Sequence, residues 1–82
     1  MSKHVVKVLG KGCARCATTE QLVRDVVAAL GADVQVEKVT RTADMIAYGV
    51  MATPSVVIDE RVVHSGGVPT RSAIEAWIGA LT

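Results

Sequence analysis

Two cysteines, Cys13 and Cys16, are the residues of this 82-residue sequence whose type and spacing can do chemistry. Cysteines separated by two residues can exchange electrons with another disulfide, or can bind a metal through both thiolates. The sequence shows no export signal, and in a reducing compartment such a pair is more often redox-active or metal-binding than a structural crosslink. Closing so short a loop would stabilise the fold by about 2 kcal/mol at most, so stability alone does not account for the pair.

The position of the pair predicts different roles for the two sulfurs. We expect a helix to begin at or near Cys13, where unpaired backbone N–H groups and the helix dipole favour the thiolate that attacks in disulfide exchange. Cys16, one turn further on, is expected to be more buried and to resolve a mixed disulfide formed by Cys13. Arg15 lies between them, and its charge would favour the thiolate further; the alternative is a solvated arginine of the first turn.

Metal binding is the alternative use of the same two thiolates. A structural zinc site usually needs four ligands, and the sequence offers only His4 and His64 besides the cysteines, so we predict no zinc site. A carrier that holds a soft metal or metalloid through the two sulfurs alone stays open as an alternative function. The run Gly12-Cys13-Ala14-Arg15-Cys16 is similar to the start of heavy-metal-associated copper chaperone domains. Those domains end in a strand, whereas this chain is expected to end in a hairpin followed by an amphipathic helix. A structural protein with inert cysteines is the third possibility.

Hydrophobic periodicity predicts a single domain over residues 1–82 with an α/β fold in the order β-α-β-α-β-β-α, a four-stranded mixed sheet flanked by three helices. The expected strands are His4 to Leu9, Asp33 to Val39, Ser55 to Ile58 and Arg61 to His64. The expected helices run from Cys13 to a cap at Gly31, from a cap at Thr40 or Thr42 to Gly49, and from Pro69 and Thr70 through an apolar stripe of Ile74, Trp77, Ile78 and Leu81.

The turn of the predicted hairpin lies at Asp59-Glu60. This dipeptide lacks the glycine that two-residue turns prefer. The sequence predicts a tight turn at Asp59-Glu60, with a wider loop as the alternative.

The order of these elements, the Cys13-x-x-Cys16 pair at the first strand-to-helix junction and Thr53-Pro54 before the hairpin together resemble the thioredoxin and glutaredoxin superfamily. Within it, the chain is similar over essentially its full length to the small redox-active disulfide proteins of bacteria and archaea. The resemblance implies a thiol–disulfide oxidoreductase whose catalytic residues are Cys13 and Cys16. It also implies a cis peptide bond before Pro54, which would face the dithiol, and strand-like binding of substrate by the backbone of Thr53.

Some positions depart from the pattern of that superfamily. Thioredoxin has a Trp before the first cysteine and Gly-Pro between the pair, where this chain has Gly12 and Ala14-Arg15. Thioredoxin also keeps a buried acid six residues before the first cysteine, where this chain has Lys7, so general-base help from that position is not expected.

Glutaredoxins follow their last strand with Gly-Gly and an Asp that holds glutathione. Gly66-Gly67 matches the glycines, while Val68-Pro69-Thr70 supplies no acid, and a flexible turn is the alternative role of the two glycines. The residues expected to bind substrate are Gly12, Ala14, Arg15, Thr53, Pro54, Gly66 and Gly67.

Charge and composition limit the classes of partner. The net charge is +1, and no cluster of Lys or Arg is interleaved with aromatic residues, so a nucleic-acid partner is not expected. No run of about 18 apolar residues predicts a membrane span. We expect a cytoplasmic monomer whose partners are protein or small-molecule disulfides and a thiol or flavoprotein reductase. No cofactor is expected beyond a redox-active Cys13–Cys16 disulfide.

Overall fold

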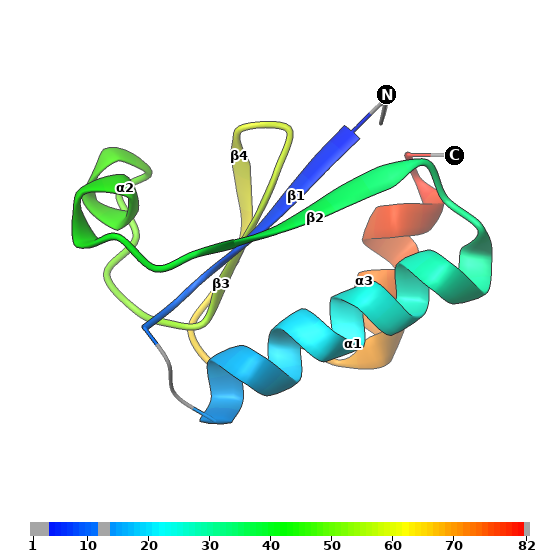
Figure 1. Cartoon of the computed structure of the whole chain (residues 1–82), viewed down its shortest axis with the longest axis horizontal. Helices are drawn as coiled ribbons and strands as arrows, with labels where there is room; N and C mark the ends of the chain where they lie inside the picture. The colour runs from blue at the N-terminus through cyan, green and yellow to red at the C-terminus, as the bar shows by residue number, and fades with distance from the viewer. Residues whose placement is uncertain (1–3, 12–13, 82) are drawn as a thin grey trace.

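A computed structural model describes residues 4–11 and 14–81, and Figure 1 shows their arrangement. The elements follow in the predicted order, which confirms the expected α/β class. They are β1 (His4–Leu9), α1 (Ala14–Leu30), β2 (Val34–Val39), α2 (Thr42–Ala47), β3 (Ser55–Ile58), β4 (Arg61–Ser65) and α3 (Arg71–Gly79).

The four strands form one mixed sheet in the order β2-β1-β3-β4. β1 runs parallel to β2 and antiparallel to β3, and β3 and β4 form the predicted hairpin. In Figure 1, α1 and α3 lie together against one face of the sheet, and α2 lies apart from them on the other side. This is the flanked mixed sheet that the sequence predicts.

The two faces of the sheet bury cores of different size. The larger core joins the sheet to α1 and α3, and its buried residues are Val6, Val8, Val23, Val26, Val56, Ile58, Ile74 and Ile78. The smaller core lies on the α2 side and consists of Leu9, Met45 and Val57. Successive strand residues point to opposite faces, so β1 and β3 each supply side chains to both cores. Their nearly continuous apolar sequences follow from this double burial.

Glycines in the left-handed conformation end α1 and α2, as predicted. Gly31 has a φ of 59° and donates its N–H to the carbonyl of Ala28, while the N–H of Ala32 reaches the carbonyl of Val27. These bonds satisfy carbonyls that the last helical turn leaves unpaired. Gly49 has a φ of 71° and closes α2 with the same pattern of bonds.

The start of α2 differs from the prediction that Thr40 or Thr42 caps it. Arg41 occupies the N-cap position without a side-chain hydrogen bond, and Thr42 is the first helical residue. The N-cap position therefore falls between the two threonines, one residue after Thr40 and one before Thr42. Asp44 lies in the first turn, where a negative charge is favourable to the helix dipole.

The beginning of α3 follows the prediction. The hydroxyl of Thr70 accepts a hydrogen bond from the N–H of Ala73 at 3.1 Å. Ile74 and Ile78 are fully buried in the larger core. Trp77 and Leu81 pack against the same core from its edge, which confirms the predicted apolar stripe.

The hairpin turn is the tight turn predicted at Asp59-Glu60. Ile58 pairs directly with Arg61, so the loop is the dipeptide Asp59-Glu60 alone, and the alternative of a wider loop does not apply. Both residues adopt left-handed conformations, with φ values of 48° and 69°. Glycine is absent from a turn that normally selects it, so other interactions must offset the cost of this backbone.

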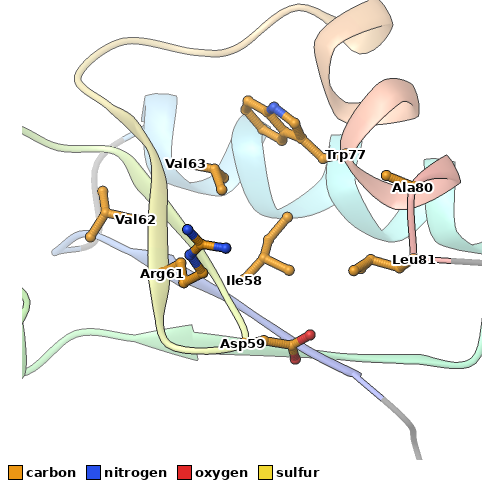
Figure 2. A pocket seen from close by; sticks show the side chains of 8 residues that line it. All are labelled: Ile58, Asp59, Arg61, Val62, Val63, Trp77, Ala80 and Leu81. Atoms are coloured by element: carbon orange, nitrogen blue, oxygen red, sulfur yellow. The ribbon is translucent and has the colours of Figure 1, made fainter.

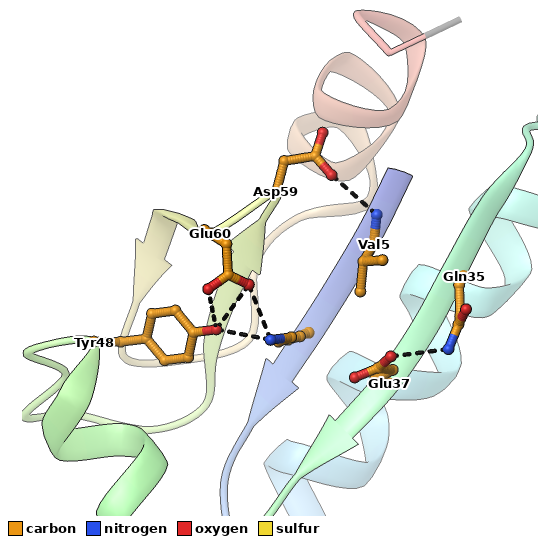
Figure 3. Close-up of polar contacts among 7 residues, drawn as sticks. Val5, Gln35, Glu37, Tyr48, Asp59 and Glu60 are labelled. Carbon is orange, nitrogen blue, oxygen red and sulfur yellow. Dashed lines mark hydrogen bonds and ion pairs between the residues drawn. The ribbon is translucent and has the colours of Figure 1, made fainter. Parts of the chain in front are cut away.

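Side-chain bonds to β1 supply that compensation, as Figure 3 shows for Asp59 and Val5. The carboxylate of Asp59 accepts the N–H of Val5 at 3.0 Å and lies 2.6 Å from Nδ1 of His4. The carboxylate of Glu60 accepts a hydrogen bond from the amine of Lys7 at 2.9 Å. The turn is thus held from outside the hairpin.

Substitution of Asp59 tests this account of the turn. Asp59→Ala removes the bonds to β1 and leaves a residue that tolerates the left-handed conformation poorly. Asp59→Asn keeps an oxygen for Val5 and tolerates that conformation. We expect the urea midpoint of unfolding to fall clearly further for the alanine variant than for the asparagine variant. Equal midpoints would contradict the compensation.

Burial in the larger core is tested by a pair of isoleucines. Ile74 is fully buried, whereas Ile46 on α2 is 70% exposed. Ile74→Ala is expected to lower the free energy of unfolding by about 2–5 kcal/mol, because it removes packed methyl groups and leaves a cavity. Ile46→Ala is the matched control and should change it by about 0.5 kcal/mol or less. Chemical denaturation followed by circular dichroism measures both.

Candidate functional site

Cys16 lies in the first turn of α1 and is buried, with 2% of its surface exposed. Its neighbours Ala14 and Arg15 begin the same helix and are exposed. The burial expected for Cys16 is thus present. Gly12 and Cys13 lie outside the residues that the structure describes.

The sulfur of Cys16 faces Gly10, the residue that follows β1. A Cβ added to Gly10 would overlap with Sγ of Cys16 and would lie 3.7 Å from Cβ of Thr53. Three segments therefore meet at this point: the end of β1, the first turn of α1 and the loop before β3. Gly10 is not among the site residues predicted from the sequence, because no local pattern reveals its contact with the sulfur.

The peptide bond between Thr53 and Pro54 is cis, as the family resemblance implied. Pro54 is buried and Thr53 is exposed, so an exposed residue directly precedes a buried one at this bond. The carbonyl of Pro54 accepts the N–H of Gly66 at 2.9 Å. This bond holds the loop before β3 against the chain that leaves β4.

Gly66 and Gly67 form a turn after β4. Their φ values are 82° and 74°, which side chains rarely adopt. A Cβ on Gly66 would also lie 3.2 Å from Cβ of Ala52. These φ values are compatible with the turn weighed for the two glycines from the sequence, and Gly66 lies beside the segment that precedes Pro54.

Lys7 points to the α2 side of the sheet and is bound there. Its amine donates hydrogen bonds to the hydroxyl of Tyr48 at 2.8 Å and to the carboxylate of Glu60 at 2.9 Å. Tyr48 and Glu60 also contact each other, as Figure 3 shows. The bonds to Tyr48 and then Glu60 raise the pKa of Lys7 well above its usual value. The bonds from Lys7 and Tyr48 lower the pKa of Glu60.

A groove of about 410 Å³ lies between the hairpin and α3, at the end of the sheet away from the Cys16 sulfur. Figure 2 shows that Val63, Trp77 and Leu81 surround it, with Asp59 at one edge. Asp59 binds the first residues of β1, whereas the Cys16 sulfur packs just beyond the last. Because a strand rises about 3.3 Å per residue, roughly the length of β1 separates the groove from the sulfur.

Among the helices in the described part of the chain, none is long and apolar enough to cross a membrane.

Comparisons with known proteins add the family context. The family described as thioredoxin domain matches residues 4–79. The chain is similar to a thioredoxin of Methanocaldococcus jannaschii, with 35% identity over 71 residues that cover 87% of this chain and 81% of the relative. A thioredoxin of Methanothermobacter thermautotrophicus is 29% identical over 85% of this chain and 91% of its own length. A solved mutant thioredoxin from Halobacterium salinarum has a TM-score of 0.77 at 25% identity, covering 99% of this chain and 76% of that one.

The pKa shifts around the hairpin turn predict how stability responds to pH. The pKa of Glu60 is lowered from its usual 4.5, so its contribution is complete above pH 4.5 and is lost as the pH falls through the lowered value. The pKa of Lys7 is raised from its usual 10.5, so its contribution is complete below pH 10.5 and is lost as the pH rises through the raised value.

Glu60→Gln and Lys7→Met are therefore expected to weaken the dependence of the urea midpoint on pH at the acidic end. The two changes remove the same interaction, so the double variant should show no more than the larger single effect. Unfolding curves collected from neutral to acidic pH measure this. Additive effects of the two substitutions would contradict the pairing.

Proposed function

The chain belongs to the thioredoxin domain family, and from that premise we propose that it is a thiol–disulfide oxidoreductase in which Cys13 attacks and Cys16 resolves. A redox function of the thioredoxin type follows from the family. The finer assignment rests on one observation: the buried Cys16 sulfur lies in the first turn of α1, against Gly10 and close to Thr53. Segments far apart in the sequence converge there on a single sulfur.

The proposed reaction has two steps of disulfide exchange. The thiolate of Cys13 attacks a substrate disulfide, forming a mixed disulfide and releasing one substrate sulfur as a thiolate. Cys16 then loses its proton to water and attacks the Cys13 sulfur. The Cys13–Cys16 bond forms, the mixed disulfide breaks, and the second substrate sulfur leaves as a thiolate that takes up a proton. The substrate disulfide has gained two electrons and the protein dithiol has lost them.

The exposed residues at the start of α1 support attack by Cys13. Helix N-termini present unpaired N–H groups and favour negative charge, and the exposed Arg15 adds a positive charge beside the pair. Ala14 is also exposed and too small to block an approaching disulfide. Gly12, Ala14 and Arg15 are therefore proposed to border the substrate at the thiol.

The opposite border of the substrate site is proposed to be the loop before β3. Thr53 is exposed next to the buried Pro54, so its backbone groups can pair with an extended substrate segment in the manner of an added strand. Gly66 is bonded to the carbonyl of Pro54, and Gly67 follows it. The absence of side chains on these glycines leaves room beside that segment.

Partners follow from the same proposal. Protein or small-molecule disulfides are the oxidised substrates, and a small thiol or a flavoprotein reductase returns the pair to the dithiol. The alternative of a soft-metal carrier has no support from the family or from the relatives. In residues 4–11 and 14–81, no three His, Cys, Asp or Glu side chains are grouped so that they could hold a metal ion.

Serine variants of the two cysteines test the proposal. Cys13→Ser is expected to abolish insulin reduction by dithiothreitol beyond the uncatalysed rate, because it removes the attacking thiolate. Cys16→Ser should also lose turnover, but it should accumulate a covalent mixed disulfide that mass spectrometry detects and a reductant removes. Circular dichroism confirms that both variants fold. Full activity of Cys13→Ser, or no adduct on Cys16→Ser, would refute the assigned roles.

A further inference from the structure

Position 10 is occupied by glycine because a side chain there would overlap with Cys16. Gly10 is buried, and it is not among the glycines with positive φ, so its backbone conformation is open to other residues. Its N–H donates to the carbonyl of Val39 at 2.9 Å, which continues the pairing of β1 with β2 beyond the last strand residue. The backbone at position 10 is therefore tied to the end of β2 by this hydrogen bond.

The space above Gly10 is occupied by Cys16. A Cβ at position 10 would overlap with Sγ of Cys16 and would lie only 3.0 Å from its Cβ. The nearest other atom is Cβ of Thr53 at 3.7 Å, an ordinary contact. The conflict thus concerns the cysteine alone, and the sulfur lies where any other residue would place its side chain.

Neither the backbone of α1 nor the backbone at Gly10 can move away from the other. Val23 and Val26 of α1 are fully buried in the larger core, so the helix cannot shift away without disturbing its packing. Gly10 is tied to β2 through Val39. Relief of the overlap must therefore come from the Cys16 side chain, which can rotate only by moving its sulfur.

We propose that Gly10 is a positioning residue of the dithiol, which lets the Cys16 sulfur lie against the end of β1 at the place from which it closes the disulfide. This inference rests on the proposed function. A disulfide tolerates a narrow range of sulfur positions, so a displaced Cys16 sulfur impairs the second exchange step. The first step, attack by Cys13 on the substrate, does not involve that sulfur and is affected less.

The redox test compares Gly10→Ala with Gly79→Ala. Gly79 is the matched control, because a Cβ there meets no atom within 4 Å and its φ is ordinary. In glutathione buffers, Gly10→Ala is expected to lower the equilibrium constant for closing the Cys13–Cys16 disulfide about tenfold, as overpacking of this size would do. Its mixed disulfide with glutathione should accumulate. Gly79→Ala should match the unsubstituted protein. An unchanged equilibrium constant for Gly10→Ala overturns the proposal.

A stability cycle tests the contact without relying on redox activity. Gly10→Ala is made in the unsubstituted protein and in a Cys16→Ala background, where the sulfur is absent. We expect the alanine to lower the folding equilibrium constant about tenfold in the first case and much less in the second. Equal losses in both backgrounds overturn the proposal, even if Gly10→Ala folds poorly. Absence of disulfide exchange in the unsubstituted protein would refute the proposed function. The stability cycle would still test the contact between Gly10 and the Cys16 sulfur.

Discussion

β1 is paired along both edges and covered on both faces, and the rest of the structure depends on this constraint. It bonds to β2 from His4 to Leu9 and to β3 from Val6 to Leu9. A shift of register by one residue would exchange the side chains of its two faces. Val6 and Val8 would then point to the smaller core on the α2 side and leave the larger core. The position at which β1 ends is therefore closely determined, and so is everything placed at that end.

The candidate site is a consequence of this register. Leu9 pairs with Ser55, so the residue after β1 and the residues before β3 are neighbours although more than 40 positions separate them in the chain. α1 begins shortly after β1 ends, and its first turn brings Cys16 over Gly10. Pairing of β3 with β4 then carries Gly66 to the carbonyl of Pro54. The site is assembled by strand pairing, and its side chains need few polar bonds among themselves.

Local patterns in the sequence were sufficient for the elements and for most of their ends. Gly31, Gly49 and Thr70 act at helix ends through bonds within a few residues, and such bonds are readable from neighbouring residue types. The cis bond before Pro54 was reached through family resemblance, since residue types alone favour a trans bond.

Two features that local sequence patterns do not explain depend on distant contacts. The Asp59-Glu60 turn breaks the local rule because its partners His4, Val5 and Lys7 lie more than 50 positions away. The sequence gives no signal for the role of Gly10, because that role depends on where one sulfur atom lies after folding. Cys13, which the sequence marks most strongly, lies outside the described residues, so its role stays a proposal.

The central place of β1 also bears on how the chain is made. A ribosome releases β1 first, and β2 follows early enough to pair with one edge while α1 covers one face. The other edge must wait for β3, and the bond between Val5 and Asp59 spans 54 positions. Until the hairpin emerges, the nascent chain carries an open strand edge of apolar sequence, the kind of surface that chaperones shield and that pairs wrongly with other chains.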